Sequence, residues 1–139
     1  MTKLADYLNC PIVTSAGHGD AIPYDYKLNA GQMGPRGNPV ATKLMKEADV
    51  ILALGTRLGF NSTFYSYDNI SKSAKIIQID IDPISIGRYF PVEIGIQGDV
   101  KIFFCFNAIN SCEATEEASA SIPIETRKYL PIIFFSNSI

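Results

Sequence analysis

Glycines recur every three residues in one loop of the sequence and could bring a ligand close to the backbone. Gly31, Gly34 and Gly37 lead into Asn38 and Pro39, a pair that is typical of a helix start. Glycine lets the backbone approach a phosphate or a cofactor ring, and a helix N-terminus offers free N–H groups to an anion. The spacing is not G-x-G-x-x-G, and no Lys-Ser/Thr follows Gly37 as in a Walker P-loop. Ligand contact and simple turn formation therefore both explain these glycines.

Two further loops carry a side chain that can recognise part of a nucleotide. Arg57 follows the apolar run 50–54, and its planar guanidinium can hold a phosphate. Asp80 lies in the run 75–82, where a carboxylate at a strand end can accept hydrogen bonds from ribose hydroxyls. The structural alternatives are a surface arginine or an internal salt bridge in the first loop and a plain turn in the second.

Residues for hydrolytic or metal chemistry are sparse. His18 is the single histidine, and although Asp20 lies two residues further on, no serine or cysteine has the sequence context of a nucleophile. The three cysteines, Cys10, Cys105 and Cys112, form no CxxC pair. We therefore assign no catalytic residue and no metal ligand, and we expect a reducing, cytoplasmic location.

Alternating strand and helix patterns are available to position these loops. The runs that predict strands are apolar and rich in β-branched residues, and residues 18–38 between the first strand and the next helix lack periodicity and predict a long functional loop. This alternation favours an α/β fold, a Rossmann-like parallel sheet flanked by helices with right-handed crossovers. The expected strands are 11–17, 50–55, 75–82 and 93–97, and the expected helices are 4–9, 39–49 and 100–109.

Size and charge exclude several classes of protein. With 139 residues, the chain fits one domain. The net charge of -2 and the absence of a basic run disfavour nucleic acid as a partner. No apolar run reaches the roughly 20 residues that span a bilayer, and the N-terminus has no signal-peptide core, so we expect a soluble protein that is not exported.

The composition changes near residue 110. Residues 1–110 carry ten basic and ten acidic groups, whereas 111–139 carry two and four. We therefore place a partial central α/β domain at 1–110 and a divergent, poorly ordered tail at 111–139. The apolar run 132–135 within this tail is also compatible with an edge strand, a contact site or an aggregation-prone end.

Five motifs, in this order, resemble the central domain of thiamine-diphosphate-dependent decarboxylases and carboligases. The resemblance covers about residues 4–109, and around His18 and Gly34 it is most similar to the sulfoacetaldehyde acetyltransferases, with the acetolactate synthases next. The motifs are 18–23 (HGDAIP), 31–37 (GQMGPRG), 48–59 (ADVILALGTRLG), 74–83 (AKIIQIDIDP) and 98–99 (GD).

The resemblance implies a three-domain enzyme of which this chain is one part. Family members have a pyrimidine-binding domain with an activating glutamate, a central α/β domain, and a domain that holds the diphosphate and Mg²⁺. This chain lacks the GDG-to-Asn diphosphate motif and has no assignable activating glutamate. We therefore expect a fragment that is inactive alone and that begins after the first strand of its domain. Its partners would be the two other domains of a homo-oligomeric enzyme, which binds thiamine diphosphate and Mg²⁺ only at full length.

Some family members bind FAD or ADP across the strand ends of the central domain. The implied activity of a sulfoacetaldehyde acetyltransferase is cleavage of sulfoacetaldehyde, release of sulfite and transfer of the acetyl group to phosphate. An acetolactate synthase-like carboligase fragment, a freestanding FAD- or ADP-binding module and a poorly folded remnant stay open as alternatives. By resemblance, the candidate nucleotide contacts are Gly34, Arg36, Gly37, Gly55, Thr56, Arg57, Asp80, Ile81, Gly98 and Asp99.

Overall fold

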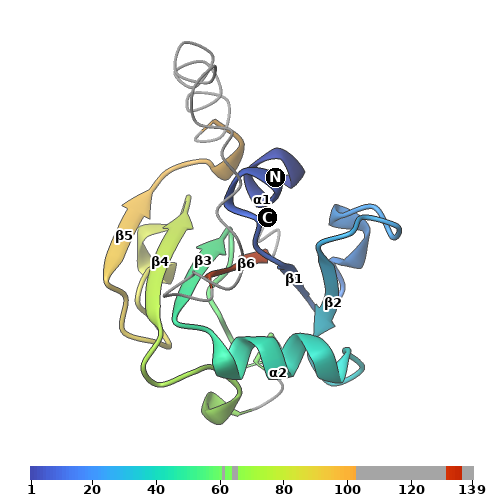
Figure 1. The fold of residues 1–139 in the computed structure, drawn as a ribbon. Helices are drawn as coiled ribbons and strands as arrows, with labels where there is room; N and C mark the ends of the chain where they lie inside the picture. Colours follow the sequence, from blue (N-terminus) through green and yellow to red (C-terminus); the bar gives the residue numbers. More distant parts are fainter. Residues whose placement is uncertain (61, 64–65, 103–130, 136–139) are drawn as a thin grey trace.

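A six-stranded parallel sheet forms the centre of the molecule (Figure 1). The computed structural model describes residues 1–60, 62–63, 66–102 and 131–135. Every strand pair is parallel, and the strand order is β2-β1-β6-β3-β4-β5. The α/β parallel sheet predicted from the sequence is therefore confirmed. Its strands are β1 (Ile12–Ser15), β2 (Asn29–Met33), β3 (Val50–Leu54), β4 (Lys75–Asp80), β5 (Ile94–Gln97) and β6 (Pro131–Phe135).

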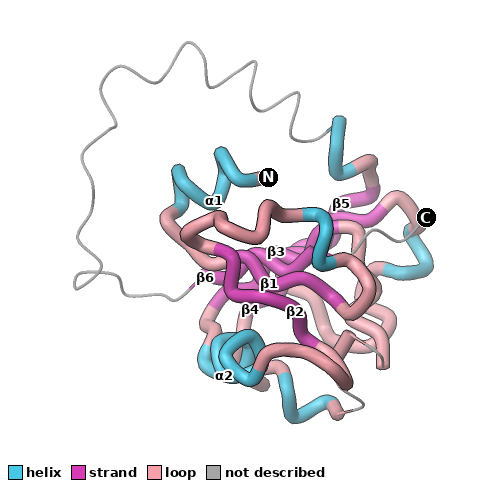
Figure 2. Tube along the Cα trace, turned by 90° about the vertical axis from the view of Figure 1, so that its right-hand side faces the viewer, coloured by secondary structure: helices cyan, strands magenta, loops and turns pink. Residues whose placement is uncertain are grey.

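Helices α1 (Thr2–Leu8) and α2 (Pro39–Glu47) cover opposite faces of this sheet, as Figure 2 shows. Successive strand residues point to opposite faces, so each central strand supplies two hydrophobic clusters. In β3, Ile51 packs in the cluster that contains Ala41 of α2, whereas Leu54 packs in the cluster that contains Ala5 of α1. Burial on both faces explains why the β3 run is apolar throughout instead of alternating.

Helix α2 begins where the sequence predicts. Asn38 has an extended backbone, and its side-chain Oδ1 accepts a hydrogen bond from the Val40 N–H at 2.9 Å. Pro39 occupies the first turn, where its missing N–H costs no helical hydrogen bond. Ala41 and Met45, four residues apart, present the buried face of the helix to the sheet.

Strand β2 lies inside the stretch 18–38, where we expected a loop without secondary structure. The expectation was wrong for Asn29–Met33, which pair in parallel with β1 at the edge of the sheet. The strand includes Asn29 and Gly31, and four of its five residues are only partly buried. Since its partly exposed residues include a glycine and two amide side chains, the hydropathy pattern typical of a strand is absent.

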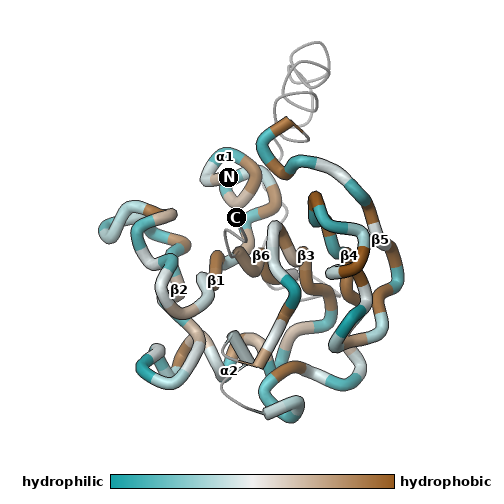
Figure 3. Tube along the Cα trace, turned by 180° about the vertical axis from the view of Figure 1, so that it is seen from behind, coloured by the Kyte–Doolittle hydropathy of each residue, from teal (hydrophilic) through white to brown (hydrophobic). Residues whose placement is uncertain are grey.

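Strand β6 is the largest departure from the sequence-based expectation. We expected a poorly ordered tail, with an edge strand as one alternative for 132–135, but Pro131–Phe135 lie in the middle of the sheet, paired with β1 on one side and with β3 on the other. Ile133 is completely buried, and its N–H donates to the Pro11 carbonyl oxygen at 3.0 Å. Figure 3 shows hydrophobic residues concentrated on β6 and the adjoining β3. The rest of the tail, and 103–109 of the helix expected at 100–109, lie outside the described residues.

No helix in the described part of the chain is long and apolar enough to cross a membrane.

The position of β6 predicts a large effect of Ile133→Ala on the free energy of unfolding. The side chain is completely buried in the cluster beside α1, so truncation should leave a cavity and lower stability by about 2–5 kcal/mol. The matched control is Ile84→Ala, because Ile84 is 74% exposed and should change stability by less than about 0.5 kcal/mol. Urea denaturation measures both variants, and equal midpoints would contradict the placement of β6.

Candidate functional site

The carboxyl ends of parallel strands lie at one edge of a sheet, so the loops that follow them converge there. Most of the predicted site residues lie at the ends of β3, β4 and β5. These three strands are neighbours in the sheet, so the residues lie side by side. The Gly34 loop follows β2, which is three strand spacings from β3, or about 14 Å at the usual spacing in a sheet. The predicted residues thus form one compact group and one more distant loop at the same edge.

Asp80 ends β4 and holds a buried carboxylate in this compact group. The residue is 1% exposed, its Oδ1 accepts from the Asp82 N–H at 3.0 Å, and its backbone oxygen accepts from the Gly98 N–H at 2.9 Å. Its Oδ2 is buried and has no hydrogen-bond partner among the described residues. Since a buried acceptor without a partner lowers stability, this oxygen is a candidate for a hydrogen bond from a ligand hydroxyl.

The loop after β3 turns sharply to present Arg57. Gly55 has a φ of 56° and donates its N–H to the Ile79 carbonyl oxygen at 2.8 Å. The buried Thr56 Oγ1 accepts from the Leu58 N–H at 3.1 Å, and Leu58 has a left-handed backbone with a φ of 51°. The Thr56 hydroxyl therefore shapes the turn, whereas the Arg57 side chain is exposed beyond it.

Gln78 ties together the loops around this group, although the sequence analysis did not single it out. Its Nε2 donates to the carbonyl oxygens of Thr56 and Ser85, both at 2.9 Å, and its Oε1 accepts from the Gly87 N–H at 2.9 Å. The side chain is 2% exposed, so these bonds form away from solvent. A single polar residue inside the apolar run of β4 is the feature that could have identified it.

Asp82 brings negative charge next to two arginines. The carboxylate caps the short helix Pro83–Ser85, accepting from the Ser85 Oγ at 2.8 Å and from the Ile84 N–H at 3.0 Å. The Ser85 hydroxyl first, then the Ile84 amide and the charges of Arg57 and Arg88, lower the pKa of Asp82 below its ordinary 3.8. Arg57 and Arg88 are therefore near enough to Asp82 for their charges to act on it.

The remaining predicted contacts are shaped mainly by their own loops. A Cβ on Gly37 would lie 2.5 Å from the Gln32 carbonyl oxygen, so packing within the loop already requires a glycine there. Gly34 has a φ of 134°, and Arg36 is exposed. After β5, the Asp99 Oδ1 accepts from the Lys101 N–H at 2.6 Å and caps the next helical turn. A Cβ on Gly98 would meet open space, and the Ile81 side chain is 62% exposed.

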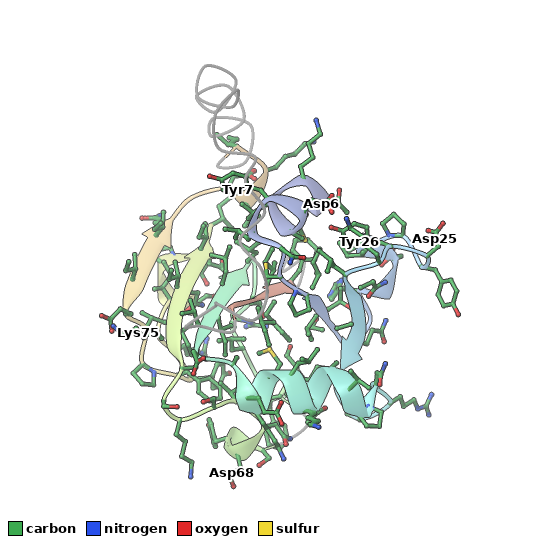
Figure 4. The ribbon with its side chains drawn as sticks, in the orientation of Figure 1. Asp6, Tyr7, Asp25, Tyr26, Asp68 and Lys75 are labelled. Carbon is green, nitrogen blue, oxygen red and sulfur yellow. The ribbon has the colours of Figure 1, made fainter. Side chains whose placement is uncertain are left out.

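A separate group of polar side chains connects α1 to the segment before β2 (Figure 4). The Lys27 Nζ lies 3.1 Å from the Asp6 Oδ1, and the Tyr26 hydroxyl donates to the Thr2 carbonyl oxygen at 3.0 Å. Partial burial and then the Asp6 carboxylate raise the pKa of Tyr26 above 10.0. Because these groups are paired with one another, they act as a structural tie.

His18 and the acidic residues form no metal centre in the described part of the chain. His18 lies after β1, half-buried, and its N–H donates to the Ser15 carbonyl oxygen at 3.1 Å. Among the described residues, no group of three or more His, Cys, Asp or Glu could hold a metal ion.

Comparison with known families explains this combination of fold and strand-end loops. Residues 1–105 match the model of the thiamine pyrophosphate enzyme central domain. The chain therefore belongs to the thiamine pyrophosphate enzymes, and the resemblance predicted from the sequence motifs is confirmed.

The most similar relatives include two types of enzyme. The chain is 45% identical over 101 residues to sulfoacetaldehyde acetyltransferase of Roseovarius nubinhibens, covering 71% of this chain and 17% of the relative. The corresponding enzyme of Rhodobacter capsulatus is 45% identical over 98 residues, covering 69% and 17%. Acetolactate synthase of Mycobacterium bovis is 34% identical over 101 residues, covering 73% and 16%. The chain thus matches about a sixth of the length of these relatives.

The role of Gln78 predicts that Gln78→Leu destabilises the protein. Leucine has a similar volume but leaves two carbonyl oxygens and one N–H without partners, which should lower the free energy of unfolding by about 3 kcal/mol. Gln97→Leu is the matched control because Gln97 is exposed at the end of β5. Thermal or urea denaturation compares the two, and similar losses in both variants would contradict a special role for Gln78.

The lowered pKa of Asp82 predicts a pH-dependent contribution to stability. Because the pKa is below 3.8 in the folded state, the carboxylate stabilises the fold at higher pH, and this contribution is lost as pH falls through the folded-state pKa. Asp82→Asn should therefore be less stable than wild type at about pH 7, and the difference should shrink as the pH falls below 3.8. Urea midpoints across this range test the prediction, which a pH-independent difference would refute.

Proposed function

We propose that this chain supplies the central domain of a sulfoacetaldehyde acetyltransferase, which converts sulfoacetaldehyde and phosphate to acetyl phosphate and sulfite. The support is the level of identity: 45% to the acetyltransferase of Roseovarius nubinhibens and 34% to the acetolactate synthase of Mycobacterium bovis. An acetolactate synthase-like carboligase is the second candidate. The absence of a CxxC pair from the sequence supports the reducing cytoplasm as the place of the reaction.

Thiamine diphosphate does not fit the groups that the described residues present. In this family, an activating glutamate is expected, but the described glutamates Glu47 and Glu93 are exposed and lie beside Lys43 and Lys75. Neither provides a carboxylate held away from solvent. We therefore assign the thiamine diphosphate and Mg²⁺ to other domains of a homo-oligomeric enzyme, and we expect the isolated chain to be inactive.

A nucleotide such as FAD or ADP fits the strand-end group better. The single observation that supports this role is the unpartnered Oδ2 of Asp80, a buried acceptor at the carboxyl end of a central parallel strand. A ribose hydroxyl can donate to this oxygen, and the exposed guanidinium of Arg57 can pair with a phosphate. Gly55 and Gly98 themselves place no side chain next to the ends of β3 and β5, and a Cβ on Gly98 would meet open space. In this proposal, the chain binds and orients the nucleotide, and it carries out no chemical step.

Expression of the entire reading frame that contains this domain tests the proposed reaction. The purified enzyme, loaded with thiamine diphosphate and Mg²⁺, should release sulfite from sulfoacetaldehyde and form acetyl phosphate in a phosphate-dependent reaction. Pyruvate is the control substrate. Formation of acetolactate from pyruvate without sulfite release from sulfoacetaldehyde would favour the carboligase, and the lack of flanking thiamine-enzyme domains would refute both assignments.

The nucleotide proposal predicts that Asp80→Asn separates binding from stability. The variant keeps the acceptor for the Asp82 N–H but replaces Oδ2 with an amide, so it should be at least as stable as wild type. Its affinity for ADP and FAD should fall about 10-fold or more, since a hydrogen bond to a charged acceptor is lost. Asp68→Asn is the control, because Asp68 pairs with Lys72 on the surface. Calorimetric titration that shows no binding to wild type, or equal binding to both variants, would contradict the proposal.

Arg57→Ala should weaken only the binding of the phosphate groups of a nucleotide. Because Arg57 is exposed on a turn, the fold should be unchanged, and ADP affinity should fall about 10-fold while adenosine affinity stays the same. Equal losses for ADP and adenosine would show that Arg57 does not contact the phosphates.

A further inference from the structure

The two halves of the sheet meet only through the last strand in the sequence. From β1 the chain moves outward to β2, and from β3 it moves outward through β4 to β5. In a doubly wound sheet of order 3-2-1-4-5-6, the position between these halves belongs to the first strand. Here β6 occupies it (Figure 1). The strand order is therefore the doubly wound one, with its first strand replaced by Pro131–Phe135.

All the strand pairing of β6 is with residues that are remote in sequence. Ile133 is paired with Ile12 of β1 and with Leu52 of β3, and each partner is about 80 residues or more away. The Ile133 N–H donates to the Pro11 carbonyl oxygen. Since β1 and β3 pair with β6 and not with each other, they form two walls of a slot that holds an extended strand.

The side chains of β6 match this slot on both faces of the sheet. Ile132 and Phe134 are buried in the cluster beside α2, and Ile133 is buried in the cluster beside α1. In the described part of the chain, β6 thus makes an apolar contact on each face and backbone pairs on each edge. All these contacts are made by the five residues of β6 themselves. The same segment from a second chain could therefore make them as well.

We propose that the slot between β1 and β3 is a binding site for an extended apolar strand, and that a second copy of this chain can supply its own Pro131–Phe135. The 28 residues from 103 to 130 connect the strand to the rest of its chain. Exchange of this strand between two copies preserves every contact of β6. The monomer and the exchanged dimer therefore differ in free energy only through the entropy of tethering the strand to its own chain or to the partner's. An intramolecular strand has an effective concentration of the order of mM, and exchange therefore becomes favourable as the protein concentration approaches this value.

Complementation between two defective full-length chains tests this proposal. Ile133→Pro should prevent a chain from filling its own slot, because proline lacks the N–H that bonds to Pro11 and disrupts a central strand. Ala53→Asp should block the slot instead, because Ala53 is completely buried in β3 opposite Phe134. Neither chain alone should melt cooperatively. An equimolar mixture should regain a cooperative melt and sediment as a 1:1 dimer with one intact sheet.

The matched control is a mixture in which the Ala53→Asp chain also carries Ile133→Pro, which removes the only intact strand and should abolish recovery. As an independent measurement, wild-type chain refolded at about 1 mM and then diluted should contain a dimer fraction that chain refolded at about 10 μM lacks. A wild-type melt of the Ile133→Pro chain alone would overturn the proposal. The proposal would also be overturned if the mixture stays unfolded and wild-type chain refolded at about 1 mM is monomeric.

Discussion

The pairing of β6 with both β1 and β3 is the interaction on which the rest of the structure depends. Parallel strands with apolar side chains on both faces are stable only when helices or loops cover both sides. Strand β6 meets this condition because α2 covers the side of Ile132 and Phe134, and α1 covers the side of Ile133. By joining the two half-sheets, it sets the relative position of the loops that follow β2 and those that follow β3.

The candidate site is built at a cost to stability that a ligand could offset. Asp80 leaves Oδ2 buried and without a partner in the described structure, whereas the neighbouring Gln78 satisfies its hydrogen-bonding groups by holding three loop residues. One residue therefore makes the strand-end loops rigid, and the other leaves an acceptor available. The exposed Arg57 and Arg88 act on the charge of Asp82, two residues beyond Asp80, and Arg57 is placed to pair with an anionic ligand.

Much of the fold could be predicted from the sequence because the relevant physics is local. The apolar run of β3 is too short for an ordinary helix, and Asn38-Pro39 provides both a cap and a first turn for α2. Strand β2 was missed because Asn29, Gly31 and Gln32 give a half-exposed edge strand no hydropathy pattern. For 132–135 the sequence offered an edge strand as one alternative, but not the central position of β6, because the partners of β6 are remote in sequence and the apolar run carries no information about them.

The nucleotide contacts of the candidate site stay a prediction. The sequence identified Arg57 and Asp80 because they follow apolar runs, but it could not distinguish a glycine that packs against its own loop, such as Gly37, from one that faces a ligand. Hydrogen exchange of the β6 amides tests the central claim most directly. The Ile133 amide should exchange as slowly as the amides of β1 and β3, through global unfolding alone. Exchange of Ile133 at the rate of an unprotected peptide would contradict the account.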